Sequence, residues 1–286
     1  MSREAAFAPD SVRVNGRPDL EVSPLDRALH FGDGLFETVA CCRGHARFLP
    51  LHLERLLLGC QRLQIDPGDP EALAAEVRTV AAEAERSIVK VIVTRGTAVA
   101  RGYGFTGREK ATRITLRYAW PQETAALSGQ GVRVRTANLR LGENPALAGL
   151  KHCNRLEQVL ARREWTDPDI AEALLYSSSG KLISGTMSNV FVVEGSRLHT
   201  PRVDTCGVAG VMRRVVMREA TLAGVSVEES VLDAAALERA DEIFLTNARI
   251  GIWPLRALDD RTLRPGPITR RLQERLAPLL EDPTDA

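Results

Sequence analysis

The chain has 286 residues, 44% of them hydrophobic, and 38 Lys+Arg against 37 Asp+Glu leave a formal net charge of +1. This balance excludes the basic field that holds a nucleic-acid backbone. The N-terminus lacks an apolar signal core, no stretch approaches the roughly 18 apolar residues of a membrane span, and the five cysteines form no CxxC pair. We therefore expect a cytoplasmic protein without bound metal or membrane contact, and favour two domains over one.

Residues 1–120 predict a small α+β domain. Residues 12–16 alternate in polarity and end in Asn15-Gly16, a hairpin signal, and residues 35–41 predict a further strand. Apolar residues at helical spacing predict a helix over 49–63, and an Ala- and Glu-rich run predicts another over 71–85. Residues 87–96 and 112–120 predict strands.

Residues 121–131, PQETAALSGQG, predict a linker because small, polar and breaker residues follow one another there. Residues 132–286 predict a larger second domain. Its expected elements are a strand in 132–141, a helix over 154–165, a hairpin over 172–193 turned at Ser179-Gly180, a helix beginning near Gly210, a strand at 242–246 and a terminal helix over 268–280.

Lys151 follows the segment ENPALAGL and precedes the helix expected over 154–165, so its amine has apolar neighbours. Partial desolvation lowers the pKa of a lysine and makes it a usable nucleophile, as Schiff-base chemistry requires. By spacing alone, a solvated surface lysine is the commoner outcome.

Two features predict an anion site. The segment DTCGVAGVMRR places small residues before an apolar helix, and the amides of Val211 and Met212 at that helix N-terminus can bind a phosphate. Arg55 in the HLER run can supply a second positive charge. An ordinary loop-to-helix junction, and a surface arginine paired with Glu54, remain open as alternatives.

The Gly-rich segment 94–104, TRGTAVARGYG, carries Arg95, Arg101 and Tyr103. Such a loop can close over a substrate that bears carboxylates, although a mobile turn between strands has the same composition. The sequence contains no HExxH pair, no GxSxG elbow and no GxxxxGK[ST] loop, which disfavours metal-dependent hydrolysis, serine-hydrolase chemistry and P-loop nucleotide binding.

Five segments occur in the order found in fold-type IV pyridoxal 5′-phosphate (PLP) enzymes, the family of the branched-chain and D-amino acid aminotransferases. They are DRALHFGDGLFETV, HLERL, LKHCNRLEQVLARREW, ISGTMSNVFVV with CGVAGVMR, and EIFLTNARIGIWPL. The chain resembles this family over about residues 12–255. Within the family it is most similar to the aminodeoxychorismate lyases, through AGLKHCNRLEQVLAR, RGYG and the threonine of FET.

The resemblance implies an α+β / α/β fold with PLP between a small N-terminal and a larger C-terminal domain. It also implies a homodimer whose partner subunit helps to wall the site. Lys151 would carry the cofactor and act in catalysis with Thr38. The other cofactor-binding residues implied are Arg55, Ser184, Asn189, Gly210, Val211, Met212 and Ala248, and the substrate residues implied are Phe31, Arg101 and Tyr103.

One departure from the family pattern concerns the electronics of the cofactor. Most relatives carry a glutamate where this chain has Ser184, and that carboxylate keeps the pyridine nitrogen protonated. A serine can only hydrogen-bond, which weakens the cofactor as an electron sink. A smaller departure is Ala248, where some relatives place a hydroxyl toward the phosphate.

The activity implied is PLP-dependent elimination of pyruvate from the small molecule 4-amino-4-deoxychorismate, giving 4-aminobenzoate for folate synthesis. Ser184 favours this reaction over transamination, because loss of pyruvate creates an aromatic ring and the substrate itself supplies driving force. Two alternatives stay open: a branched-chain or D-amino acid aminotransferase, and a catalytically silent PLP-binding paralogue.

Overall fold

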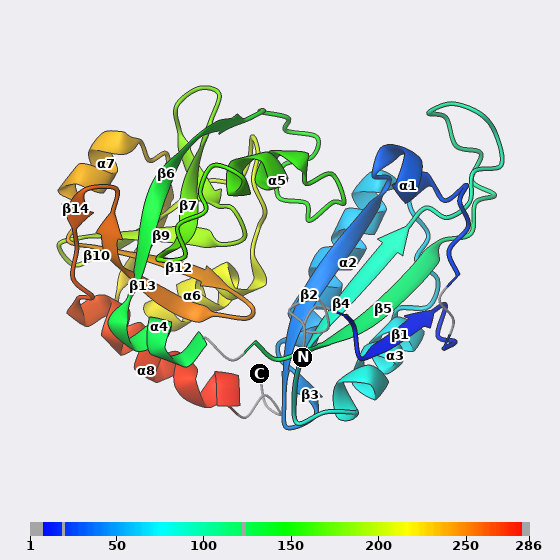
Figure 1. The fold of residues 1–286 in the computed structure, drawn as a ribbon, viewed down its shortest axis with the longest axis horizontal. Helices are drawn as coiled ribbons and strands as arrows, with labels where there is room; N and C mark the ends of the chain where they lie inside the picture. The colour runs from blue at the N-terminus through cyan, green and yellow to red at the C-terminus, as the bar shows by residue number, and fades with distance from the viewer. Residues whose placement is uncertain (1–7, 19–20, 122–123, 282–286) are drawn as a thin grey trace. The chain divides into compact units, whose positions relative to one another are not determined.

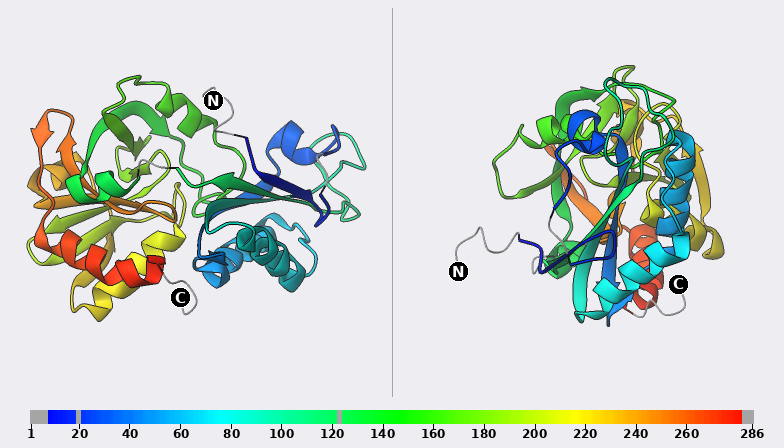
Figure 2. Two further views of the ribbon diagram at one scale, coloured as in Figure 1. Left: turned by 60° about the horizontal axis from the view of Figure 1, so that its bottom comes forward. Right: turned by 90° about the vertical axis from the view of Figure 1, so that its right-hand side faces the viewer.

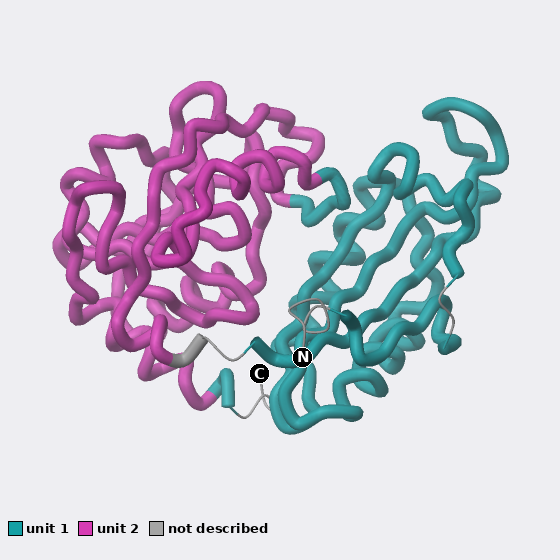
Figure 3. Tube along the Cα trace, in the orientation of Figure 1, with its two compact units in different colours: residues 1–121, 150–154, 279–286 teal, residues 122–149, 155–278 magenta. Residues whose placement is uncertain are grey.

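The computed structural model describes residues 8–18, 21–121 and 124–281. The chain divides into two compact units, shown in Figure 3. Unit 1 comprises Met1–Pro121, Leu150–Asn154 and Leu279–Ala286, and unit 2 comprises Gln122–Gly149 and Arg155–Pro278. The chain therefore leaves unit 1 and returns to it for the short segment that contains Lys151.

Unit 1 is built on an antiparallel five-stranded sheet in the order β1-β5-β4-β2-β3. Helices α2 and α3 cover one face of it (Figures 1 and 2). The strands are β1 (Ser11–Val14), β2 (Gly34–Cys42), β3 (His45–Ala46), β4 (Arg86–Thr94) and β5 (Thr112–Ala119), and the helices are α1 (Arg27–Phe31), α2 (Leu49–Leu63) and α3 (Pro70–Ala82).

The core of unit 1 lies between this sheet and the two helices. Leu56 and Cys60 of α2 and Leu73 of α3 pack against Leu35 and Val39, which alternate along β2 and so face the helices. The apolar residues of 49–63 therefore form the buried face of α2, as their helical spacing predicts.

Unit 2 is a mixed nine-stranded sheet with helices packed around it. The strand order is β11-β10-β9-β12-β13-β6-β7-β8, and β14 pairs with β13. The strands are β6 (Val132–Leu141), β7 (Ile170–Ser177), β8 (Leu182–Gly185), β9 (Asn189–Glu194), β10 (Arg197–Pro201), β11 (Ser226–Ser230), β12 (Glu242–Asn247), β13 (Gly251–Leu258) and β14 (Arg261–Thr262). The helices are α4 (Thr124–Gln130), α5 (Leu156–Arg162), α6 (Val211–Leu222), α7 (Ala234–Arg239) and α8 (Pro267–Glu281).

Most of the predicted elements are confirmed, with ends that shift by a few residues. The turn at Asn15-Gly16 is present, with φ of 52° and 77°, although β1 pairs with β5 and the returning chain contributes only the bridge at Arg17. No helix in the described part of the chain is long and apolar enough to cross a bilayer.

Unit 1 ends at Pro121, within the segment 121–131 expected to be a linker, but residues 124–130 of that segment form helix α4. Leu127 packs against the core of unit 2, and Gly131, at φ 84°, donates its amide to the Leu127 carbonyl at 2.9 Å and ends the helix. Gln273 of α8 adds a 2.8 Å hydrogen bond to the Ser128 carbonyl. Tertiary contacts thus decide the structure of a segment whose composition suggests a loop.

Two further predictions are corrected. The helix expected over 154–165 begins only at Leu156, because the residues before it pair with β2. The hairpin expected over 172–193 exists as β7 and β8 around Ser179-Gly180, but β8 ends at Gly185 and the next strand pairs with β10 and β12 instead.

Candidate active site

Lys151 lies alongside the first residues of β2 in unit 1. His152 forms a bridge with Leu35, the Phe36 amide donates to the Lys151 carbonyl at 2.9 Å, and the Cys153 amide donates to the Gly34 carbonyl at 2.9 Å. Neighbours across an antiparallel pair share a face. Lys151 and Phe36 do so, and Lys151 Nζ lies 4.3 Å from the centroid of the Phe36 ring.

A second lysine shares this face of the sheet. Alternation along β2 places Thr38 beside Phe36, on the face opposite α2 and α3. Lys90 of β4 pairs with Thr38, and its Nζ lies 5.2 Å from the Phe36 centroid. Two lysine side chains thus approach one aromatic ring, and Thr38 lies two residues from Phe36 on the same face of β2. Sequence reasoning missed Lys90, although a single charged residue inside the apolar run SIVKVIVT was a usable signal.

Arg55 is paired on the helix-covered face of the same strand. Its Nε and Nη2 donate to the Glu37 carboxylate at 2.7 and 2.5 Å, and His52 Nδ1 lies 2.6 Å from Glu37 Oε2. The alternative partner, Glu54, is therefore wrong as the main ion pair of Arg55. The two hydrogen bonds to Glu37 fix the orientation of the Arg55 guanidinium.

Electrostatics hold Glu37 as a buried carboxylate. Burial raises its pKa, but Arg55 and His52 outweigh burial and lower the pKa from 4.5 to about 2. Burial also lowers the pKa of His52 against the opposing effect of Glu37, so the imidazole is neutral at pH 7 and donates its Nδ1–H. With Arg55 positive, Glu37 negative and His52 neutral, the three side chains carry no net charge.

The predicted substrate residues lie at the end of the sheet where β2 begins. Gly34 pairs with Thr94, so the loop that follows β4 emerges at that end. In this loop Arg101 is exposed and Tyr103 is 84% exposed. The Phe31 ring, at the end of α1, lies 5.2 Å from the Tyr103 ring. The structure thus brings the Phe31 and Tyr103 rings together, and Arg101 belongs to the same loop as Tyr103.

In unit 2, the start of α6 has the features expected of an anion site. Gly210 is its N-cap and supplies no side-chain acceptor to the first-turn amides, among them those of Val211 and Met212. A Cβ at Gly210 would lie 2.0 Å from Asn189 Oδ1, so only glycine fits there. Asn189 in turn donates to the Val208 carbonyl at 2.9 Å, which ties the loop before α6 to β9.

Ser184 is the last residue but one of β8 and is 9% exposed. Its hydroxyl donates to the Gly185 carbonyl at 2.8 Å, which leaves the lone pairs of Oγ to accept a hydrogen bond. Ala248 lies in the turn after β12, and the neighbouring Asn247 side chain donates to the Met187 carbonyl at 3.1 Å. Ser184 thus lies just before the turn of residues 186–188, and Asn247, the neighbour of Ala248, donates a hydrogen bond to that turn.

A buried glutamate organises that turn. Glu172 is 1% exposed and accepts hydrogen bonds from the Met187 amide at 2.9 Å, from Ser188 Oγ at 2.8 Å and from Thr186 Oγ1. This anchor explains why β8 stops at Gly185 and does not continue into β9. Glu172 was missed from sequence, although it is the one charged residue in the strand IAEALLYS.

These groups suit PLP in their chemistry. An amine such as that of Lys151 reacts with the cofactor aldehyde, and a guanidinium and helix-terminal amides bind its phosphate. In the described residues no group of three or more His, Cys, Asp or Glu side chains is placed to hold a metal ion.

Comparison with known proteins identifies relatives along most of the chain. Residues 34–258 match the family described as Amino-transferase class IV. Aminodeoxychorismate lyase from Vibrio harveyi is 33% identical over 267 residues, 92% of this chain and 98% of that protein. D-alanine aminotransferase from Bacillus licheniformis is 28% identical over 275 residues, 92% of this chain and 93% of that protein. The crystal structure of 4-amino-4-deoxychorismate lyase from Pseudomonas aeruginosa matches with a TM-score of 0.91 and 43% identity, covering 95% of this chain and 100% of that one.

Proposed function

Because the chain belongs to the amino-transferase class IV family of PLP-dependent enzymes, we propose that it is a 4-amino-4-deoxychorismate lyase that releases pyruvate and forms 4-aminobenzoate. The observation that carries the proposal is the arrangement on one face of β2 and β4, where Lys151 and Lys90 flank the Phe36 ring beside Thr38. This arrangement offers a base, a cation for a carboxylate and a hydroxyl for proton transfer. Lyases among the relatives support the same assignment.

In the proposal, residues of each unit contribute to cofactor binding. The Lys151 amine would hold the aldehyde carbon of PLP, and Arg55 would hold the phosphate. In unit 2, the amides of Val211 and Met212 would bind the phosphate at the start of α6, where Asn189 holds the preceding loop at Val208 and Gly210 is the N-cap, and the backbone at Ala248 would add to the same role. Ser184 Oγ accepts a hydrogen bond at the ring nitrogen.

The chemistry needs one proton taken and one delivered. When bound, PLP would take up the substrate amine in place of Lys151, which frees the Lys151 amine, and would withdraw electrons from the carbon that carries the substrate amine. The Lys151 amine removes the proton from that carbon, and the bond between the ring and the enolpyruvyl oxygen breaks. Lys151 returns this proton, directly or through the Thr38 hydroxyl, to the methylene carbon of the leaving group, which becomes pyruvate. The ring becomes aromatic, and no external oxidant or reductant is consumed.

Substrate recognition follows from charge. The substrate carries two carboxylates, and Lys90 and Arg101 supply cations for them, with arginine suited to planar two-point pairing. Phe31 and Tyr103 then supply the aromatic surface beside the substrate ring.

The proposal extends to the assembly and location of the protein. We place the two compact units as the small and large domains of the family, and expect a homodimer that acts in the cytoplasm. Free thiols at all five cysteines, each in the described part of the chain, suit a reducing compartment.

The test is release of 4-aminobenzoate from enzymatically generated aminodeoxychorismate by the PLP-loaded protein, with Lys151→Ala as the inactive control. Release by the wild type and none by the variant supports the lyase. Amino transfer from an amino acid to a 2-oxo acid, without release, supports the aminotransferase alternative. Bound PLP with neither reaction identifies a silent paralogue.

A further inference from the structure

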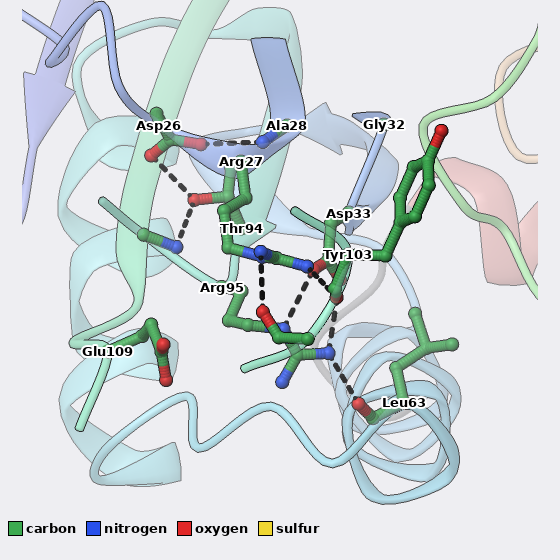
Figure 4. Close-up of polar contacts among 12 residues, drawn as sticks. Asp26, Arg27, Ala28, Gly32, Asp33, Leu63, Thr94, Arg95, Tyr103 and Glu109 are labelled. Atoms are coloured by element: carbon green, nitrogen blue, oxygen red, sulfur yellow. Dashed lines mark hydrogen bonds and ion pairs between the residues drawn. The ribbon is translucent and has the colours of Figure 1, made fainter. Parts of the chain in front are cut away.

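Arg27, the first residue of α1, is a buried guanidinium whose donors are directed at the loop between β4 and β5. It is 4% exposed. Its Nη1 donates to the carbonyls of Gly102 and Gly104 at 3.3 and 3.1 Å, and its Nη2 donates to the Tyr103 carbonyl at 2.8 Å. Figure 4 shows this side chain among its polar contacts. One arginine therefore binds three consecutive carbonyls of a loop more than 70 residues away in sequence.

The loop has few other reasons to hold one conformation. The pairing of β4 with β5 ends at Thr94 and Thr112, so the residues between them lie outside the sheet ladder. Gly102 and Gly107 adopt positive φ, and a Cβ at either would touch nothing within 4 Å. Glu109 holds the backbone at Thr106 and Gly107, whereas the carbonyls of residues 102–104 are held by hydrogen bonds from the buried Arg27.

A carboxylate fixes Arg27 in turn. Its Nε donates to Asp33 Oδ2 at 2.8 Å, and Arg95 donates to the same carboxylate through Nε at 2.7 Å and Nη2 at 3.1 Å. Burial raises the pKa of Asp33, but hydrogen bonds from Arg95 and Arg27 outweigh it and keep the pKa below 3.8. Arg95 also lies 3.9 Å from the Phe105 ring centroid, which restrains the loop one residue beyond Gly104.

The start of α1 is itself attached to the sheet. Asp26 caps the helix by accepting from the Ala28 amide at 2.9 Å, and it accepts from Thr94 Oγ1 at 2.8 Å. A chain of contacts therefore runs from Thr94, at the end of β4, through Asp26 and Arg27 to the carbonyls of residues 102–104. Arg27 binds only the backbone of residues 102–104, and the Tyr103 side chain stays exposed.

We propose that Arg27 is a positioning residue for substrate binding: by holding the carbonyls of Gly102, Tyr103 and Gly104, it sets the direction in which the side chains of Arg101 and Tyr103 point. The proposal rests on the proposed function, in which those two side chains meet the substrate. Arg27 itself does not contact the substrate. It lowers the entropic cost of binding by ordering the loop beforehand.

The experiment compares Arg27→Met and Arg27→Lys with Arg113→Met in the PLP-loaded protein. Arg113 is a matched control because it also forms an ion pair in unit 1, with Glu76 at 2.7 Å, and none of its hydrogen bonds reaches the loop tip. The first measurement is the rate of trypsin cleavage after Arg101, followed by mass spectrometry of the fragments. The second is KM and kcat for release of 4-aminobenzoate.

Loss of the three hydrogen bonds should raise cleavage after Arg101 about tenfold or more, since cleavage follows the population of the open loop. Arg27→Lys keeps the charge next to Asp33 but cannot span three carbonyls, so it should show the same effect at nearly wild-type stability. In both variants KM should rise about tenfold while kcat stays within about twofold of wild type. Arg113→Met should change neither quantity.

Wild-type cleavage in both Arg27 variants would overturn the proposal, and so would faster cleavage with an unchanged KM. A fall in kcat at constant KM would show a structural role only, which also refutes it. If Arg27→Met does not fold, Arg27→Lys decides the question alone. Absence of 4-aminobenzoate from the wild type would instead refute the proposed function, and the cleavage rates would still report whether Arg27 anchors the loop.

Discussion

Glu37→Gln tests the buried ion pair that orients Arg55. The substitution keeps the shape of the side chain and removes its charge, so Arg55 Nη2 and His52 Nδ1 no longer share a carboxylate oxygen. The drop in the pKa of Glu37 from 4.5 to about 2 corresponds to about 3 kcal/mol. A similar loss is typical when one partner of a buried pair is removed.

We therefore expect cofactor-free Glu37→Gln to unfold roughly 6–12 °C below the wild type, measured by calorimetry or circular dichroism. With PLP bound, the difference should shrink, because the cofactor phosphate replaces the lost carboxylate as the anion next to Arg55. The matched control is Glu76→Gln, which disrupts the Arg113 pair in the same unit. That variant should lose equal stability with and without PLP.

The free energy of unfolding should decrease as the pH falls through the acid range. Because the pKa of Glu37 is lowered in the folded protein, its contribution is present above about pH 4.5 and is lost as the pH falls toward about 2. The lowered pKa of His52 acts in the same direction below about pH 6.5, where the unfolded chain takes up a proton first. Glu37→Gln should flatten the stability curve between pH 4.5 and 2. Equal losses in the PLP-free and PLP-loaded variant would refute phosphate binding by Arg55, and an undiminished acid slope would refute the ion pair as its source.

Three further predictions concern other parts of the site and the core. Lys90→Met should raise KM for aminodeoxychorismate about tenfold with a smaller effect on PLP binding, because one carboxylate loses its cation; an unchanged KM would remove Lys90 from the substrate site. Ser184→Glu should add amino transfer to a 2-oxo acid, measured beside 4-aminobenzoate release, and no gain would contradict the link between Ser184 and reaction choice. Burial raises the pKa of Cys60 to about 12 and of Cys41 to about 11, so at pH 8 a thiol reagent should label the partly exposed Cys153 first and these two only on unfolding. Early labelling of Cys60 would show that the core beneath α2 opens readily.

Periodicity predicted the elements whose structure depends on local pattern. The helix over 49–63 has a buried stripe and a polar stripe. The strand within 87–96 has five apolar residues out of the six between Ser87 and Thr94, and Lys90 is the exception. Helix α4 was missed because its structure depends on α8 and on the core, which a short window of PQETAALSGQG does not reveal.

From the sequence, only those residues of the candidate site that lie within a recognisable local motif could be predicted. The N-cap glycine of α6 and the lysine after AGL are visible in sequence. The partners that orient these groups are not, since Arg55 meets Glu37 across 18 residues and Arg27 meets the loop tip across 75 or more. The recurrent signal is a charged side chain in an apolar strand, as at Glu172 and Lys90, and it points to a buried partner or a ligand.

Residues 150–154 belong to unit 1, and this limits where the chain can be cut into fragments that fold on their own. Leu150 is 3% exposed in the core beside Leu35, and the next residues complete the edge of β2. A fragment ending at Pro121 would lack both, and would expose apolar surface and unpaired amides along β2. A split of the gene in the 121–124 region should therefore yield two halves that are poorly folded apart, and that regain Lys151 beside Phe36 only by fragment complementation.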